Sequence, residues 1–251
     1  MEIDWRAPPG SFDDIALVLL GTAWDYQDRP DEFLARLDAL AALGIIVCNP
    51  PETVRWNIDK RYLQELAMRG ATTVPTLWLD DAGAPDIRAA MAEFDADRVV
   101  VKRQVGAGAL GQHSFTHASL LDDGWRMGRP CMVQPFLSGV VEEGEYSFVF
   151  IDGAFSHAVL KRAAEGEYRI QSLYGGRETA YAPDPADLAA AQAVLAALPF
   201  PAPLYCRIDM ARLPSGELAV MEAEMIEPYL YPEQAPALGE RLAAAVSSRL
   251  S

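Results

Sequence analysis

A β-hairpin in the second half of the sequence constrains the fold more strongly than any other feature. Two runs rich in aromatic and β-branched residues, YSFVFI at 146–151 and AFSHAVLKR at 154–162, flank the dipeptide Asp152-Gly153. Asp-Gly favours a two-residue turn because both positions of that turn need positive φ. A second hairpin is predicted between 205 and 225, around a Pro-Ser-Gly turn. The second half is therefore expected to consist mainly of antiparallel sheet.

The first half alternates strands and helices instead. IALVLLG at 15–21 predicts a buried strand, Pro30 begins an amphipathic helix that ends at Gly44, and IIVC at 45–48 predicts another strand. A strand, a helix and a strand in this order are typical of a parallel αβ unit. The other predicted elements are helices at 57–69, 86–94, 185–198 and 236–249, and strands at 72–79, 98–104 and 131–137. Together these elements predict an α+β fold with a small αβ module at its front.

The composition narrows the classes of partner. The net charge of the 251 residues is -15, which disfavours binding to nucleic acid or to anionic membranes. The three cysteines lie far apart in apolar stretches, and the three histidines lack a second ligand at metal spacing, so neither a disulfide framework nor a zinc site is predicted. The start, MEIDWRAPPG, does not resemble a signal peptide, and no apolar run is long enough to span a bilayer. We therefore expect a cytoplasmic protein.

Lys102 and the glycine-rich segment after it form the first candidate site. Gly106, Gly108 and Gly111 match a dinucleotide fingerprint by their spacing, but no amphipathic helix follows them. A glycine loop after a lysine can instead surround phosphates with its backbone N–H groups, while the lysine supplies a positive charge. An ordinary glycine-rich turn fits the same residues equally well.

Asp209, Glu222 and Glu224 form the second candidate site. Asp209 lies in one arm of the second hairpin and the two glutamates lie two residues apart in the other, so all three can project from one face. Carboxylates that converge in an apolar setting repel one another unless a cation neutralises them, and oxygen ligands favour Mg²⁺ or Mn²⁺. The alternative is the solvated face of an edge hairpin.

Basic and hinge-like residues complete the candidate site. Cations around a metal–carboxylate centre are what polyphosphate transfer requires, and the basic residues in or beside ordered apolar elements are Lys60, Lys102, Lys161, Arg169 and Arg207. Each of them alone also fits a surface position. An adenosine site is predicted in MVQPFLSGVVEE, with backbone groups of Gln134, Pro135, Phe136 and Leu137 for adenine and a carboxylate of Glu142 or Glu143 for ribose. Taken alone, the same residues favour a core strand followed by a solvated acidic loop.

In this order the motifs resemble those of the ATP-grasp superfamily of carboxylate–amine ligases, from about Asn49 to Pro232. NPPETVRWNIDK resembles the family's entry segment, VVVKRQVGAGALG its strand lysine and glycine loop, and MVQPFL its adenine hinge. EYRIQSLYGG resembles its arginine-bearing strand, while RIDM and VMEAEMIEP resemble its Arg-x-Asp and Glu-x-Asn strands. The ordered set is far more specific than any single motif.

Two departures from the family pattern indicate a branch within it. Glu224 stands where relatives carry asparagine, and Ser147 stands where many carry arginine. With TAWDYQDRPDEF, RWNIDKRYL and FSHAVLKR, these positions resemble the branch that contains the D-cycloserine-forming cyclo-ligase. Members of that branch commonly begin with one more strand and helix than we predict here, so the front module is expected to be shortened.

The resemblance implies an ATP-grasp fold, in which two α+β subdomains grip ATP, preceded by the shortened αβ module. The expected units are the front module at 1–56, the small subdomain with the glycine loop at 57–130, and the C-terminal subdomain with the metal site at 131–251. The resemblance also implies a small-molecule carboxylate and an amine as substrates, with a homodimer as one candidate assembly.

The implied reaction has two steps. ATP first phosphorylates the carboxylate, with two Mg²⁺ ions on the three acids and the phosphates on Lys60 and Lys102. An amine then displaces phosphate, with Arg207 stabilising the oxyanion and with Lys161 and Arg169 completing the catalytic set. Two alternatives remain open: an intramolecular cyclo-ligase, and a nucleotide-binding accessory protein without turnover.

Overall fold

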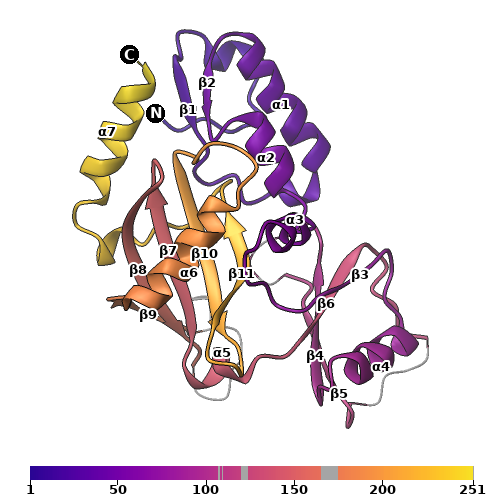
Figure 1. Ribbon diagram of the computed structural model, residues 1–251. Helices are drawn as coiled ribbons and strands as arrows, with labels where there is room; N and C mark the ends of the chain where they lie inside the picture. The colour runs from indigo at the N-terminus through magenta and orange to yellow at the C-terminus, as the bar shows by residue number, and fades with distance from the viewer. Residues whose placement is uncertain (107, 109, 120–123, 165–174, 251) are drawn as a thin grey trace.

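The fold consists of three β-sheets with helices packed on them (Figure 1). The computed structural model describes residues 1–106, 108, 110–119, 124–164 and 175–250. One sheet pairs β1 with β2, a second has the strand order β3-β6-β4-β5, and a third has the order β11-β10-β7-β8-β9. No helix among the described residues is long and apolar enough to cross a membrane.

The N-terminal module is a parallel αβ unit, as the sequence predicts. β1 (Leu17–Leu19) and β2 (Ile46–Cys48) pair in parallel, and α1 (Pro30–Ala42) connects them. The buried face of α1 packs its Phe33, Leu37 and Leu40 side chains into a cluster with residues of the surrounding loops. Two short 3₁₀ helices, η1 (Pro9–Phe12) and η2 (Tyr26–Asp28), complete the module and contribute Phe12 and Tyr26 to this cluster.

The predicted helix at 57–69 is corrected by two shorter helices. α2 (Pro51–Asn57) ends where that helix was expected to begin, and α3 (Tyr62–Met68) follows after a break. Pro51 favours the start of α2, because the first position of a helix needs no backbone N–H donor. Asn57 is therefore not an N-cap, and its buried side chain is available for tertiary contacts.

The small sheet is antiparallel, and one of its faces is covered by α4 (Ala84–Glu93). Its strands are β3 (Leu77–Leu79), β4 (Arg98–Arg103), β5 (His113–Thr116) and β6 (Cys131–Pro135). The expected boundary between 130 and 131 assigns β6 to the C-terminal unit, whereas β6 pairs with β3 and β4 in the small sheet.

The large sheet is also antiparallel and contains both hairpins predicted from the sequence. Its strands are β7 (Glu145–Ile151), β8 (Ala154–Arg162), β9 (Arg177–Tyr181), β10 (Tyr205–Arg212) and β11 (Leu218–Glu224). Asp152 and Gly153 both have positive φ, which confirms the turn expected between β7 and β8. The α5 helix (Ser138–Glu142) precedes β7.

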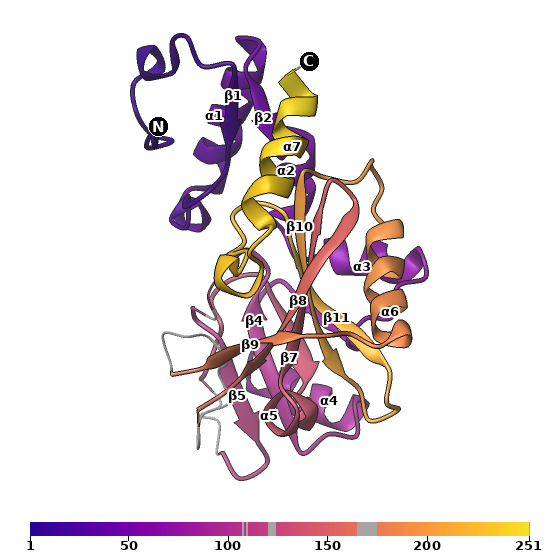
Figure 2. The ribbon, with the colours of Figure 1, turned by 90° about the vertical axis from the view of Figure 1, so that its left-hand side faces the viewer.

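The two faces of the large sheet differ in character. One face packs the apolar side chains of β7, β10 and β11 against α6 (Pro185–Ala196) and α3. On the other face, Val149, Ile151 and Val159 pack with Leu238 and Ala245 of α7 (Leu238–Leu250) near one end. A third 3₁₀ helix, η4 (Pro232–Gln234), precedes α7, which runs beside the two-stranded sheet (Figure 2). The rest of this second face carries charged residues.

Candidate active site

Strand register places charged side chains in one row across the large sheet. Asp209 in β10 lies opposite Glu222 in β11 on one side and opposite Ser147 in β7 on the other. Arg207 lies opposite Glu224, and Glu145 lies opposite Lys161 of β8. Directly opposite residues of antiparallel strands share a face, so the four strands bring these groups together. We call these seven residues the charged row.

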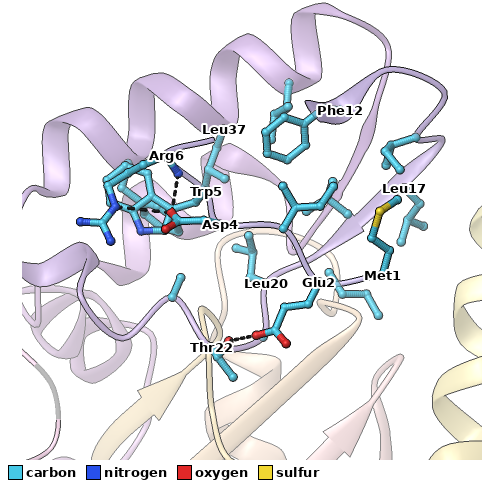
Figure 3. Close-up of a pocket in the computed structure, with 18 of the residues that line it drawn as sticks. Met1, Glu2, Asp4, Trp5, Arg6, Phe12, Leu17, Leu20, Thr22 and Leu37 are labelled. Atoms are coloured by element: carbon cyan, nitrogen blue, oxygen red, sulfur yellow. Dashed lines mark hydrogen bonds and ion pairs between the residues drawn. The ribbon is translucent and has the colours of Figure 1, made fainter. Parts of the chain in front are cut away.

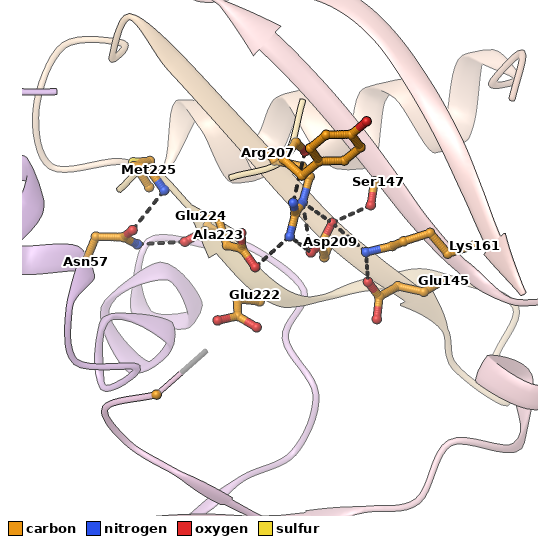
Figure 4. A network of polar contacts seen from close by, with 12 residues as sticks. Asn57, Glu145, Ser147, Lys161, Arg207, Asp209, Glu222, Ala223, Glu224 and Met225 are labelled. Atoms are coloured by element: carbon orange, nitrogen blue, oxygen red, sulfur yellow. Dashed lines mark hydrogen bonds and ion pairs between the residues drawn. The ribbon is translucent and has the colours of Figure 1, made fainter. Parts of the chain in front are cut away.

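Asp209 is at the centre of the charged row, with Arg207 and Lys161 on either side of it (Figure 4). Arg207 Nη2 lies 2.9 Å from Asp209 Oδ2, and Lys161 Nζ lies 3.3 Å from Oδ1. Ser147 Oγ donates a hydrogen bond of 2.5 Å to Oδ1. Burial would raise the pKa of Asp209, but Arg207, Lys161 and the hydrogen bonds outweigh it and hold the pKa at about 2.

Arg207 and Lys161 also bind the glutamates of the charged row. Arg207 Nη2 lies 2.6 Å from Glu224 Oε1, and Lys161 pairs with Glu145. Arg207 donates a further hydrogen bond of 3.0 Å to the carbonyl of Tyr229, which follows β11. Each cation therefore bridges two carboxylates, and the network is largely neutralised from within.

The sequence contains three lysines, and all three meet at this site. Lys60, between α2 and α3, places Nζ 2.8 Å from Glu222 Oε1 and donates to the carbonyl of Gly106. Lys102 comes from β4 of the small sheet, and within the described ranges its ammonium makes no hydrogen bond or ion pair. Burial lowers the pKa of Lys102, while Glu222 and Glu145 oppose that shift. Residues of the small sheet thus face the charged row of the large sheet.

The three acids predicted as metal ligands share this face but are held by cations. Among the residues that the structure describes, no three His, Cys, Asp or Glu side chains are arranged to bind a metal ion. Burial raises the pKa of Glu224 to about 7, and Glu222 and Asp209 add to the rise although Arg207 opposes it. The oxygen atoms of the three acids are of the type that a hard divalent cation prefers, although in this arrangement Lys60 and Arg207 hold them instead.

Two buried side chains of the N-terminal half fix the strand that carries Glu222 and Glu224. Asn57 Nδ2 donates to the carbonyl of Ala223 at 2.6 Å, and Asn57 Oδ1 accepts from the Met225 N–H at 2.9 Å (Figure 4). The hydroxyl of Tyr62 accepts from the Ala223 N–H at 2.9 Å. β11 is an edge strand, so these side chains satisfy the backbone groups on its open side.

Comparison with known proteins identifies the family. A family model described as the N-terminal domain of the D-cycloserine synthetase DcsG matches residues 2–49. The cycloserine biosynthesis protein DcsG of Streptomyces lavendulae is 30% identical over 250 residues, covering 90% of this chain and 81% of that protein. The chain belongs to the DcsG family of ATP-grasp ligases.

Solved structures agree with the assignment of this chain to the DcsG family. The crystal structure of D-cycloserine synthetase DcsG matches with a TM-score of 0.84 and 26% identity, covering 99% of this chain and 89% of that one. A D-alanine–D-alanine ligase from Bacillus anthracis matches with a TM-score of 0.65 and 20% identity, covering 96% of this chain and 82% of that one. The ATP-grasp ligase PsnB, complexed with a phosphomimetic variant of its minimal precursor, Mg and ADP, matches with a TM-score of 0.65 and 19% identity. The match covers 92% of this chain and 78% of that one. The expected α+β ATP-grasp fold is confirmed.

The glycine loop of this ligase meets the entry lysine. Gly108 and Gly111 both have positive φ, and a Cβ on Gly111 would lie 2.5 Å from Arg103 Nε. The positive φ favours glycine at 111, and a larger residue there would also displace the end of the Arg103 side chain. Gly106 is tied to the site through the bond from Lys60 to its carbonyl.

The predicted adenosine residues lie where β6 leaves the small sheet. Gln134 is buried and donates to Thr76 Oγ1 at 2.9 Å, while the Phe136 N–H donates to the carbonyl of Arg98 at 2.9 Å. Pro135 ends β6, and Leu137 is buried beside the start of α5. Their role toward adenine stays a prediction.

The structure does not bring every predicted residue into the charged row. Glu143 Oε2 accepts from Arg212 Nε and from the hydroxyl of Tyr146, whose ring lies on the α6 face of the sheet. Glu142 is exposed at the end of α5. Arg169 lies outside the described residues.

Sequence reasoning missed Glu145, which begins β7 on the same face as Ser147. The alternation of that strand was the available signal, because residues two apart share a face and Ser147 had already been singled out. Burial raises the pKa of Glu145, although Lys161 opposes the shift. The structure also adds Tyr26 and Glu227, for which the sequence offers no pattern.

A separate cavity lies in the N-terminal module of the ligase (Figure 3). It is lined by the first residues of the chain, by β1 and the loop after it, and by apolar side chains of α1. None of the residues of the charged row lines it. The candidate active site is the charged row, because predicted site residues gather there and none of them lines this cavity.

Proposed function

We propose that this protein phosphorylates a substrate carboxylate with ATP and joins the acyl group to an amine, releasing ADP and phosphate. One observation carries the proposal: all three lysines, Arg207 and the three predicted metal ligands meet between the small and large sheets. Preorganised cations in a partly buried site stabilise the charge of a phosphoryl group in transfer. The membership of an ATP-grasp ligase family supports the same reading.

Each group has a proposed role in the first step. Lys60 and Lys102 neutralise phosphate oxygens from the side of the small sheet. Asp209, Glu222 and Glu224 are the residues that would hold Mg²⁺, or Mn²⁺ in its place. When bound, the ion neutralises charge on the phosphates and orients them. Lys161, now shared between Glu145 and Asp209, remains beside the transferred group to balance its charge.

In the second step an amine displaces phosphate from the acylphosphate. The neutral amine nitrogen attacks the carbonyl carbon, phosphate leaves with the electron pair of the carbon–oxygen bond, and the nitrogen gives its extra proton to the departing phosphate. Arg207 is proposed to stabilise the oxyanion that forms, since its guanidinium is fixed by Asp209, Glu224 and the Tyr229 carbonyl.

We also propose that the enzyme is cytoplasmic and that it forms a homodimer. Light scattering would test the homodimer.

Intramolecular ligation is the second candidate. It is favoured by the 30% identity to a cycloserine biosynthesis protein and by the match of residues 2–49 to the N-terminal domain of a D-cycloserine synthetase. In that case one substrate carries both the carboxylate and the amine, and its ring closes at the same site.

An ADP-release screen tests the proposal. The protein is incubated with ATP, Mg²⁺ and pools of D- and L-amino acids, and hydroxylamine in a parallel set traps an acylphosphate as its hydroxamate. Glu222→Ala serves as the inactive control, because it removes one of the proposed metal ligands. Release that depends on two compounds supports intermolecular ligation, and release with one compound and a cyclic product supports the cyclo-ligase. Release no greater than that of Glu222→Ala with every pool would contradict the proposed function.

A further inference from the structure

Glu227 is a buried carboxylate that forms no ion pair with any residue that the structure describes. It lies three residues beyond Glu224, in the segment that leaves β11, and only 8% of it is exposed. Within the described part of the chain it forms no ion pair and no hydrogen bond to another residue. A buried carboxylate without a partner is unfavourable, and such groups in folded proteins are normally bound to a cation, a donor or a ligand.

The backbone on either side of Glu227 is fixed by side chains from other elements. Met225 donates its N–H to Asn57 Oδ1 and accepts at its carbonyl from Asn49 Nδ2 at 2.7 Å. The carbonyl of Ile226 accepts from the hydroxyl of Tyr205 at 2.9 Å. The backbone that leads to Glu227 is therefore fixed by these hydrogen bonds.

This position is the junction between the charged row and the N-terminal module. Ile226 packs into the hydrophobic cluster of that module, together with Phe33 and Tyr26. Two residues after Glu227, the carbonyl of Tyr229 accepts a hydrogen bond from Arg207. Glu227 thus lies between the proposed oxyanion-stabilising arginine and the N-terminal module.

Tyr26 supplies a second polar group at the same junction. Its ring stacks on Phe33 with centroids 5.3 Å apart, and only 6% of the residue is exposed. Among the described residues its hydroxyl has no hydrogen-bond partner. Burial raises the pKa of Tyr26, and the next largest cause is Glu227, followed by Glu224 and Glu222. Glu227 is therefore the carboxylate with the largest effect on this hydroxyl.

We infer that Glu227 and Tyr26 form the subsite for the amine of the substrate, where Glu227 pairs with its ammonium form and accepts the proton that the nitrogen loses before it attacks. The inference rests on the proposed function, because it places this amine next to the acyl carbon whose oxyanion Arg207 is proposed to stabilise. An ammonium group fits better than a metal ion, because one carboxylate and a neutral phenol are a poor donor set for a divalent cation. Burial, with Glu224 and Glu222, raises the pKa of Glu227 to about 8, and a bound cation would reverse that shift.

Glu227→Gln tests the subsite because it keeps the shape of the side chain and removes its charge. The probes are glycine, D- and L-alanine, D- and L-serine and β-alanine, each compared with its acid lacking the amine. ADP release is measured with ATP and Mg²⁺, and hydroxamate formation with hydroxylamine measures carboxylate activation alone. Glu233→Gln is the matched control, since it makes the same change at an exposed position six residues later.

Glu227→Gln is expected to raise the KM for the amine-bearing probe by about 10- to 100-fold, the range of a charge-assisted hydrogen bond. The KM for ATP and the hydroxamate yield from the acids lacking an amine stay within about twofold of wild type, and Tm does not fall. Tyr26→Phe is expected to raise the same KM by a smaller factor. An unchanged KM for the amine, or an equal rise in the KM for ATP, overturns the subsite alone. Failure of the wild type to release ADP with every probe overturns the proposed function, and the subsite with it.

Discussion

Among single residues, the two lysines on the small-sheet side of the candidate site differ in what they contribute to the free protein. Lys60 forms an ion pair with Glu222 and a hydrogen bond to the Gly106 carbonyl, so its ammonium group already has partners in the folded protein. Lys102 is half-buried and has no described partner, and burial lowers its pKa, so its charge is unfavourable in the free protein. A group that is unfavourable for folding and yet aimed at a candidate functional site is best explained by a ligand.

Replacing each lysine by methionine separates these roles. Lys60→Met is expected to lower the free energy of unfolding by about 1–3 kcal/mol, because a carboxylate and a carbonyl lose their donor. Lys102→Met is expected to leave that free energy unchanged or to raise it. Both variants are expected to lose ADP release by at least about 100-fold. Urea unfolding without nucleotide measures the first quantity, and greater destabilisation by Lys102→Met would contradict the assignment.

Glu224 predicts a pH dependence of stability. Its pKa of about 7 in the folded protein lies above the ordinary value of 4.5, so its stabilising contribution is complete below pH 4.5. That contribution is lost as pH rises through 7, because the unfolded chain then holds fewer protons than the folded one.

Glu224→Gln removes this dependence and is measured by thermal unfolding in EDTA from pH 4.5 to 8.5. We expect the Tm of the variant to approach that of wild type near pH 5 and to exceed it near pH 8. Glu233→Gln should follow wild type throughout. A difference between variant and wild type that does not change with pH would show that Glu224 is ionised at all these values.

At the scale of elements, the sequence predicts what is local. Both hairpins of the large sheet were found because turn residues and alternating strands are adjacent in the chain. β5 and β9 were missed, because HSFT and RETAY are polar and their pairing with β4 and β8 is supplied by the neighbouring strands. Propensity is a weak guide where tertiary pairing decides.

Asn57 shows the limit of local reasoning in the site itself. As a polar residue before a helical pattern it predicts an N-cap, but its amide instead binds a strand 166 positions away. No pattern within a window of the sequence carries that information. The charged row was likewise predictable within the hairpins, whereas its contact with Lys60 and Lys102 follows only from the packing of three sheets.

Asn57→Ala is expected to destabilise the protein by about 2–4 kcal/mol, since a buried N–H and a buried carbonyl of β11 lose their partners. It should also weaken ADP release, because Glu222 and Glu224 are carried by the strand that loosens. Gln64→Ala on the exposed face of α3 is the control and should change neither quantity by much. Urea denaturation measures the first effect. A loss of stability without any loss of activity would contradict the proposed role of Asn57 in positioning Glu222 and Glu224.

For the whole molecule, the candidate site is built from parts whose apolar residues gather in different clusters. The small sheet and α4 share one cluster, the N-terminal module has another, and the large sheet has its own. Lys102 from the small sheet, Lys60 from the segment between α2 and α3, and the carboxylates of the large sheet meet at this site. A ligand bound there therefore stabilises the arrangement of all three parts at once.

Mg²⁺ with ADP is accordingly expected to raise the Tm of the whole chain in a single transition. At a concentration 100 times the Kd, binding adds about 2.7 kcal/mol to the folded state. For a chain of this size that corresponds to a rise of about 5–10 °C, since each kcal/mol shifts Tm by about 2–4 °C. The rise should be much smaller in EDTA, in Glu222→Gln and in Lys102→Met, because ion and phosphate contacts lie on opposite sides of the candidate site. A full rise in Glu222→Gln but not in Lys102→Met would mean that the nucleotide is held by the small sheet alone, and that the carboxylates of the large sheet do not serve it.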